Sequence, residues 1–281
     1  MSDSLQKLQS LQTPLKLTTD PWLTAGQRLG FWGSCFSQEM AQRFENLEVP
    51  VWLHPWGTVF SPRAMREQIR ALLTDAWSPC PCESQSCIWE AAHKTQALKH
   101  GPTTNLIQDQ IKELDCLFIT LGSAFAYRHL PSNRWVANCH KIPQSQFEKH
   151  LFDPQSIAQD LVEIREGLHA LNPQLKVVWT LSPVRHLRDG LLENSRSKAQ
   201  LLSAIHHQVD NSQDRYFPSY EIAVEQLRDH RFFAEDLAHL NPWAIDFIFD
   251  RLCETWGHPE WTEQLRRASL KKTSSNHRPN Q

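Results

Sequence analysis

Short apolar runs that alternate with helical segments constrain the fold of this chain more than any other feature. The runs at residues 28–33, 116–122 and 176–183 contain at most one charged residue each, and each leads through polar residues into a further element. Strands that are apolar along their whole length are typical of parallel sheets covered by helices. The sequence therefore predicts an α/β protein built around a parallel sheet.

The segments between these runs carry helical spacing. The clearest is residues 154–171, where Ile157, Leu161, Ile164 and Leu168 recur at intervals of four, three and four and so share one helical face. We expect further helices over residues 38–48, 62–75, 103–112, 145–150, 192–210 and 242–256. We also expect a short strand over residues 49–54, a pair of extended segments within 124–138, and a last strand over 215–222. Because Pro218 interrupts that last run, it is expected at the edge of the sheet.

The domain organisation follows from composition along the 281 residues. Residues 27–256 contain no internal repeat and no Gly/Ser linker, which predicts one domain. Residues 77–102 break the alternation with prolines, cysteines and tryptophans and are expected to be an insertion over one sheet edge. The polar residues 1–26 are expected to be a lead-in segment, and the polar, basic residues 257–281 a disordered tail.

Charge and terminal sequence exclude several classes of partner. The 29 Lys and Arg residues nearly balance the 31 Asp and Glu residues, so nothing in the overall charge favours nucleic acid or an anionic membrane. There is no basic segment followed by an apolar run, and no stretch of about 18 apolar residues. We expect a cytoplasmic protein whose seven cysteines are mostly reduced thiols.

The run at 28–33 ends in Gly33 and Ser34, where the chain passes directly into a helix. The first N–H groups of a helix have no partner within the helix, so a side chain at this junction lies beside donors suited to a developing oxyanion. The Ser34 hydroxyl is therefore a candidate nucleophile. Two alternatives remain: Ser34 is an ordinary N-cap, or the adjacent Cys35 thiol is the nucleophile.

Reactive residue types follow the predicted strands, and the carboxyl ends of parallel strands share one edge of the sheet where ligands bind. Among them, Asp236 and His239 are three residues apart, a spacing that lets the carboxylate reach the imidazole. A carboxylate on one ring nitrogen leaves the other nitrogen to accept a hydroxyl proton. Together with Ser34, this pair predicts a catalytic triad.

Several segments resemble the GSCFA domain family, which is grouped with the SGNH/GDSL-type esterases and acyltransferases. The resemblance covers roughly residues 27–256. It rests on the motif Gly33-Ser-Cys-Phe-Ser37 and on six further segments in order: Pro55-Trp-Gly-Thr-Val-Phe-Ser-Pro, Thr120-Leu-Gly-Ser-Ala-Phe-Ala-Tyr, Val136-Ala-Asn-Cys-His-Lys-Ile-Pro, Ser182-Pro-Val-Arg-His, Tyr216-Phe-Pro-Ser-Tyr-Glu and Asp236-Leu-Ala-His.

The resemblance implies a three-layer α/β/α sandwich with a parallel, flavodoxin-like sheet and a triad of Ser34, His239 and Asp236. It also implies an oxyanion hole formed by the N–H of Ser34, the N–H of Gly57 and an asparagine side chain. These enzymes usually carry that asparagine two residues after a glycine, whereas here Gly122 is followed by Ser123 and Ala124. We therefore expect Asn138 to supply the side chain, with His140 as the alternative.

Three histidine and arginine side chains are expected to contact substrate: His140, Arg185 and His186. The alternative for the last two is an ion pair with Asp189 or Glu193. Lys141 is expected to be a surface charge. Cys80, Cys82 and Cys87 lack the spacing of structural zinc sites, so no metal site and no cofactor are expected.

These observations predict a serine-dependent acyl-ester hydrolase that acts on a small-molecule or glycan ester. One alternative is an O-acyltransferase that passes the same acyl group to a sugar or another alcohol. Another is a catalytically silent glycan-binding module, with the tryptophan-rich residues 77–100 as a lid over the cleft.

Overall fold

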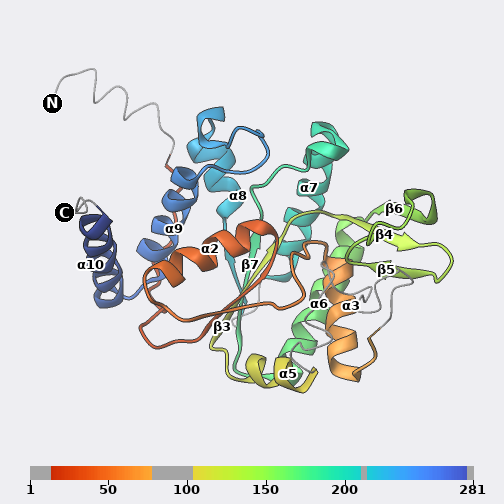
Figure 1. Cartoon of the computed structure of the whole chain (residues 1–281), viewed down its shortest axis with the longest axis horizontal. Helices are drawn as coiled ribbons and strands as arrows, with labels where there is room; N and C mark the ends of the chain where they lie inside the picture. The colour runs from red at the N-terminus through yellow and green to blue at the C-terminus, as the bar shows by residue number, and fades with distance from the viewer. Residues whose placement is uncertain (1–13, 78–103, 210–213, 277–281) are drawn as a thin grey trace.

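A five-stranded parallel sheet forms the centre of the computed structural model, which describes residues 14–77, 104–209 and 214–276 (Figure 1). The strand order is β2-β1-β3-β7-β8, and every pairing in this sheet is parallel. The strands are β1 (Leu29–Gly33), β2 (Val51–Leu53), β3 (Cys116–Leu121), β7 (Lys176–Leu181) and β8 (Asp214–Phe217). This order is the flavodoxin-like one, so the predicted fold class is confirmed.

Helices cover both faces of the sheet (Figure 1). One layer contains α2 (Cys35–Asn46), α9 (Pro242–Trp256) and α10 (Pro259–Asn276). The other contains α3 (Pro62–Thr74), α5 (Thr104–Lys112), α6 (Pro154–Leu171) and α7 (Leu191–Gln208). The molecule is therefore a three-layer sandwich, and the amphipathic helix predicted over 154–171 has those bounds.

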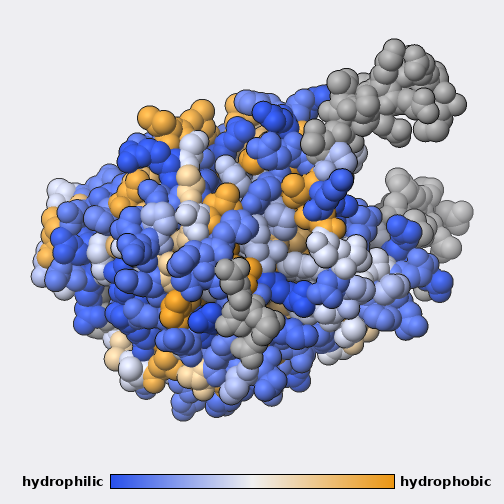
Figure 2. Space-filling model, turned by 180° about the vertical axis from the view of Figure 1, so that it is seen from behind, coloured by the Kyte–Doolittle hydropathy of each residue, from blue (hydrophilic) through white to orange (hydrophobic). Residues whose placement is uncertain are grey.

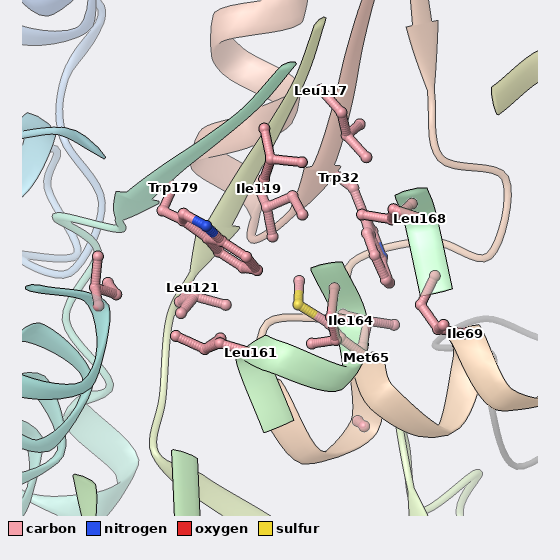
Figure 3. Close-up of a cluster of buried hydrophobic side chains, with 14 of the residues drawn as sticks. Trp32, Met65, Ile69, Leu117, Ile119, Leu121, Leu161, Ile164, Leu168 and Trp179 are labelled. Atoms are coloured by element: carbon pink, nitrogen blue, oxygen red, sulfur yellow. The ribbon is translucent and has the colours of Figure 1, made fainter. Parts of the chain in front are cut away.

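The side chains along each strand alternate between the two faces of the sheet, so the hydrophobic core has two halves. On β1, Phe31 packs with α2 and α9, whereas its neighbour Trp32 packs with α3 and α6. Ile119 and Trp179 point to the same side as Trp32 and meet Leu161 and Ile164 of α6 (Figure 3). Because successive side chains of a strand point to opposite faces, each buried strand supplies both halves of the core.

A second, antiparallel sheet lies beside the first, with the order β5-β4-β6. Its strands are β4 (Phe125–His129), β5 (Arg134–Val136) and β6 (Phe147–Leu151). The helix expected over 145–150 is wrong: a 3-10 turn, η1 (Gln144–Gln146), leads into β6, which pairs with β4 along its whole length. In so short a segment, pairing with a neighbouring strand outweighs local helical preference.

The expected disordered tail is also corrected. Residues 259–276 form α10, because Trp261 and Leu265 lie four residues apart on one helical face and are buried in the core beside Phe44. The last strand ends at Phe217, five residues earlier than expected, because Pro218 cannot donate to a ladder. Residues 219–227 are helical instead, as α8 (Ser219–Glu221) and the π-helical turn η3 (Ile222–Leu227).

The expected insertion at 77–102 falls almost entirely outside the described residues, including Cys80, Cys82 and Cys87. On the face shown in Figure 2, hydrophobic residues form separate patches among hydrophilic ones. Within the described part of the chain, no helix combines the length and apolar character needed to cross a membrane.

Candidate functional site

The turn from β1 into α2 depends on Gly33. Its φ of +139° is unusual for other residues, and a Cβ here would overlap the backbone of Thr120. The Ser34 N–H donates to the Thr120 carbonyl at 3.1 Å, which closes the last pair of the β1–β3 ladder, Gly33 with Thr120. The Ser34 side chain is 3% exposed, and its Oγ is buried without a hydrogen-bond partner. Ser34 precedes α2, but its side chain makes no cap hydrogen bond.

Cys35 is the first residue of α2, and its side chain is partly exposed. Burial raises the pKa of its thiol, and the Glu39 carboxylate acts in the same direction, while the N–H groups of Phe36 and Cys35 and the Lys198 ammonium lower it. The thiol is therefore protonated at neutral pH and lies among groups that stabilise its anion.

The loop that carries Gly57 lies against this turn. Gly57 has a φ of +80°, which favours glycine. Next to it, the Thr58 hydroxyl accepts a hydrogen bond from Gln38 Nε2 of α2 at 3.1 Å. Further along, the Phe60 carbonyl accepts from the Gly122 N–H at 2.8 Å, which ties the loop to the end of β3. The structure thus brings the Gly57 loop to the first turn of α2.

Asp236 and His239 form the predicted pair. His239 Nδ1 is 2.6 Å from Asp236 Oδ2, and Oδ1 of the same carboxylate accepts from the N–H groups of Ala238 and His239. The hydrogen bond from His239 lowers the pKa of Asp236 to about 2. An ionised carboxylate accepts the Nδ1 proton and leaves Nε2 to accept another. Both side chains are about half exposed.

Arg185 holds this turn in place. Its N–H donates to the Ala238 carbonyl at 3.0 Å, and its guanidinium lies 3.8 Å from the centre of the Phe233 ring. Neither expected ion pair forms in the described structure, since Asp189 pairs with Lys149 and Glu193 with Arg196. Because Arg185 follows β7, its contacts place the Asp236–His239 turn at the carboxyl edge of the sheet.

A cavity of about 490 Å³ lies between the Phe60 loop, the small sheet and the loop after β7. His186 and Asn138 line it, together with the aromatic rings of Phe60, Phe125 and Tyr127. Burial, with the nearby Lys198 charge, lowers the pKa of His186 to about 4, so its imidazole is neutral. The ring lies against Gly122 and Phe60. His186 can therefore exchange neutral hydrogen bonds with a ligand in the cavity.

The structure does not bring all of the expected site residues together. Asn138 Oδ1 accepts from the His140 N–H at 3.2 Å, and His140 is buried. The cavity lining includes Asn138 and His186 but not Ser34, Gly57, His140, Arg185 or His239. Ser34 Oγ makes no hydrogen bond to His239, and the Ser34 N–H expected in the oxyanion hole already donates to Thr120.

Lys198 is a site residue that the sequence analysis missed. It is 2% exposed, and its Nζ donates to the carbonyls of Gly122 at 2.8 Å and Ser182 at 2.7 Å, at the ends of β3 and β7. Burial lowers its pKa to about 7. One signal was available: Lys198 is in helical register with the apolar Leu201 and Ile205.

Metal ligands do not gather in the part of the chain that the structure describes, where no group of three His, Cys, Asp or Glu side chains is arranged to hold an ion. The cysteines at 80, 82 and 87 lie outside those residues.

Comparison with solved structures finds several esterases of low sequence identity. A carbohydrate esterase family 3 from Talaromyces cellulolyticus is 11% identical, with a TM-score of 0.39, over 86% of this chain and 99% of the other. The lipase Lip_vut3 from a goat rumen metagenome is 12% identical, with a TM-score of 0.39, over 86% and 97%. An acetyl xylan esterase, Est2A, from Butyrivibrio proteoclasticus is 9% identical, with a TM-score of 0.43, over 86% and 65%.

Sequence comparison is decisive for the family. No curated protein matches the chain. The model of the GSCFA family, however, matches residues 28–252, which span every strand of the parallel sheet, helices α2 to α8 and most of α9. The chain belongs to the GSCFA family.

Proposed function

We propose that this protein is an esterase-type hydrolase that acts on a small-molecule or glycan ester through a covalent acyl intermediate. The observation that carries the proposal is the Asp236–His239 pair, with 2.6 Å between Oδ2 and Nδ1, on a loop bound to the residue that follows β7. The β1–α2 turn, which offers Ser34 and Cys35, belongs to the same edge of a parallel sheet. A nucleophile and an oriented base are the two parts that acyl transfer requires.

In the proposed reaction, His239 Nε2 accepts the proton of the nucleophile while Asp236 holds the imidazole through Nδ1. The sequence assigns the nucleophile to Ser34, whose Oγ must turn out of its buried position to reach a substrate. Gly57 and Asn138 are proposed as oxyanion donors. Removing one such donor from an enzyme costs on the order of 100- to 1,000-fold in rate.

Hydrolysis of p-nitrophenyl acetate tests the proposal. His239→Ala should reduce turnover by at least about 100-fold, because the nucleophile loses its base. His207→Ala, which removes an exposed histidine at the end of α7, is the matched control and should retain wild-type turnover. Turnover that survives in purified His239→Ala protein would refute the proposed role of the pair.

The same assay separates the two alternatives from hydrolysis. In an acyltransferase, an added sugar acceptor would take the acyl group, and the ester of that sugar would accumulate in place of free acid. A silent binding module would bind a glycan saturably and release no p-nitrophenol above the background rate.

A further inference from the structure

The backbone at the β1–α2 turn decides which side chain reaches the sheet edge. The Ser34 N–H donates to the Thr120 carbonyl, and the Ser34 backbone is extended, with a ψ of 170°. The Ser34 side chain is 3% exposed. Its Oγ is accordingly buried and unpartnered.

Cys35 lies in a different environment, at the start of α2. It is the first residue with helical backbone, and its side chain is partly exposed while those of Ser34, Phe36 and Ser37 are buried. The N–H groups of Cys35 and Phe36 favour negative charge on its sulfur. The positive end of a helix dipole adds to this effect at the first turn. Of the two candidate nucleophiles, Cys35 is the one accessible to a substrate.

A buried cation completes this environment. Lys198 acts on Cys35 electrostatically, and its Nζ donates to the backbone carbonyls of Gly122 and Ser182. The titratable side chains that face it are Cys35, His186 and Tyr220. The pKa is raised for Cys35 and Tyr220 and lowered for His186, so all three are neutral at pH 7. At pH 7 Lys198 is charged in about half of the molecules, and in these its charge is available to an anion that forms nearby.

From these observations we infer that Sγ of Cys35, rather than Oγ of Ser34, carries the acyl group in the reaction. The inference rests on the proposed esterase function and deepens it by assigning the covalent intermediate. The enzyme would then be an esterase with a cysteine nucleophile and a Cys35–His239–Asp236 triad, in which Lys198 stabilises negative charge beside the nucleophile.

The chemical step is balanced without any redox partner. His239 takes the thiol proton as Sγ attacks the ester carbonyl carbon, and the C–O bond to the alcohol breaks as the alcohol leaves with that proton. Water then attacks the thioester, His239 takes a proton from the water, and the C–S bond breaks. The sulfur recovers the proton, and a carboxylic acid is released.

Mapping of the acyl-enzyme tests the assignment. The full-length protein is mixed with p-nitrophenyl acetate, quenched in acid, digested and analysed by mass spectrometry for added acetyl groups. We expect acetyl on Cys35, removed by neutral hydroxylamine as thioesters are. Cys35→Ala should lose at least about 100-fold in turnover, whereas Ser34→Ala should remain within about threefold of wild type.

Two variants control for damage to the fold. Ser37→Ala removes another buried, unpartnered hydroxyl from α2, and Cys253→Ala removes a buried cysteine from α9. Both should match wild type in turnover, and circular dichroism checks that every variant is folded.

The possible outcomes distinguish the inference from the proposed function. Acetyl on Ser34, with activity lost in Ser34→Ala and kept in Cys35→Ala, overturns the inference and leaves the esterase function standing. Turnover with no acetyl on either residue overturns the inference and the covalent mechanism. Absence of turnover in the wild-type protein removes the proposed function and the inference with it.

Discussion

We predict that Lys198 makes the stability of the protein depend on pH. In the folded chain, burial lowers the pKa of this lysine to about 7, whereas an unfolded chain holds the proton until about pH 10.4. Between these values the unfolded state binds about one more proton than the folded state. The free energy of unfolding therefore rises with pH across this window, with a slope of up to about 1.4 kcal/mol per pH unit from this residue.

The expected magnitude follows from the two pKa values. At pH 7 the buried lysine is about half protonated, and at pH 9 it is almost fully neutral while the unfolded chain is still protonated. Raising the pH from 7 to 9 should therefore add about 2 kcal/mol to the free energy of unfolding through this residue alone. Lys198→Met, which has a stem of similar length and no charge, should lack this gain.

Urea unfolding at pH 7 and pH 9, followed by circular dichroism, measures the difference. Lys198→Met also loses the hydrogen bonds to Gly122 and Ser182, and it does so at both pH values, so only the change in stability between them is diagnostic. Lys112→Met removes an exposed lysine and should follow wild type. The other groups that face Lys198, which are Cys35, His186 and Tyr220, are retained in all three proteins. Equal gains in wild type and Lys198→Met would refute the reasoning.

Three further predictions concern the site and its frame. Asp236→Asn should reduce turnover of p-nitrophenyl acetate at least about 100-fold, because an amide no longer fixes the His239 tautomer; unchanged turnover would exclude the triad. Gly33→Ala should destabilise the fold by about 3 kcal/mol or more in urea unfolding, since its Cβ overlaps Thr120 at a φ of +139°. Asn172→Ala should cost about 2 to 3 kcal/mol in the same assay, because Asn172 Nδ2 donates to three carbonyls at the α5–β3 connection; a loss below 0.5 kcal/mol would contradict this.

Much of the fold could be predicted because it depends on local patterns. The apolar runs at β3 and β7 indicated buried parallel strands, and Asn241 followed by Pro242 marked the start of α9, where the Asn241 side chain accepts from the Ala244 N–H. The spacing of Asp236 and His239 likewise predicted a contact that the turn provides.

What the sequence could not provide depends on contacts between distant segments. Ser34 is held by a hydrogen bond to Thr120, which lies 86 residues later in the chain, and the packing around this turn leaves Ser34 buried and Cys35 partly exposed. The burial of Lys198 depends on the ends of β3 and β7, where the carbonyls of Gly122 and Ser182 accept hydrogen bonds from its Nζ. The triad itself stays a prediction.

The cavity is lined by three separate parts of the chain: the loop at 58–61, the small sheet β5-β4-β6, and the loop after β7. The small sheet contributes no strand to the parallel sheet that supports Cys35 and the Asp236–His239 turn. Lengthening or reshaping its hairpin would therefore alter which molecules fit without moving the reactive groups. If the proposed esterase function holds, a change in this sheet would change the shape of the cavity while Cys35 and the Asp236–His239 turn keep their places.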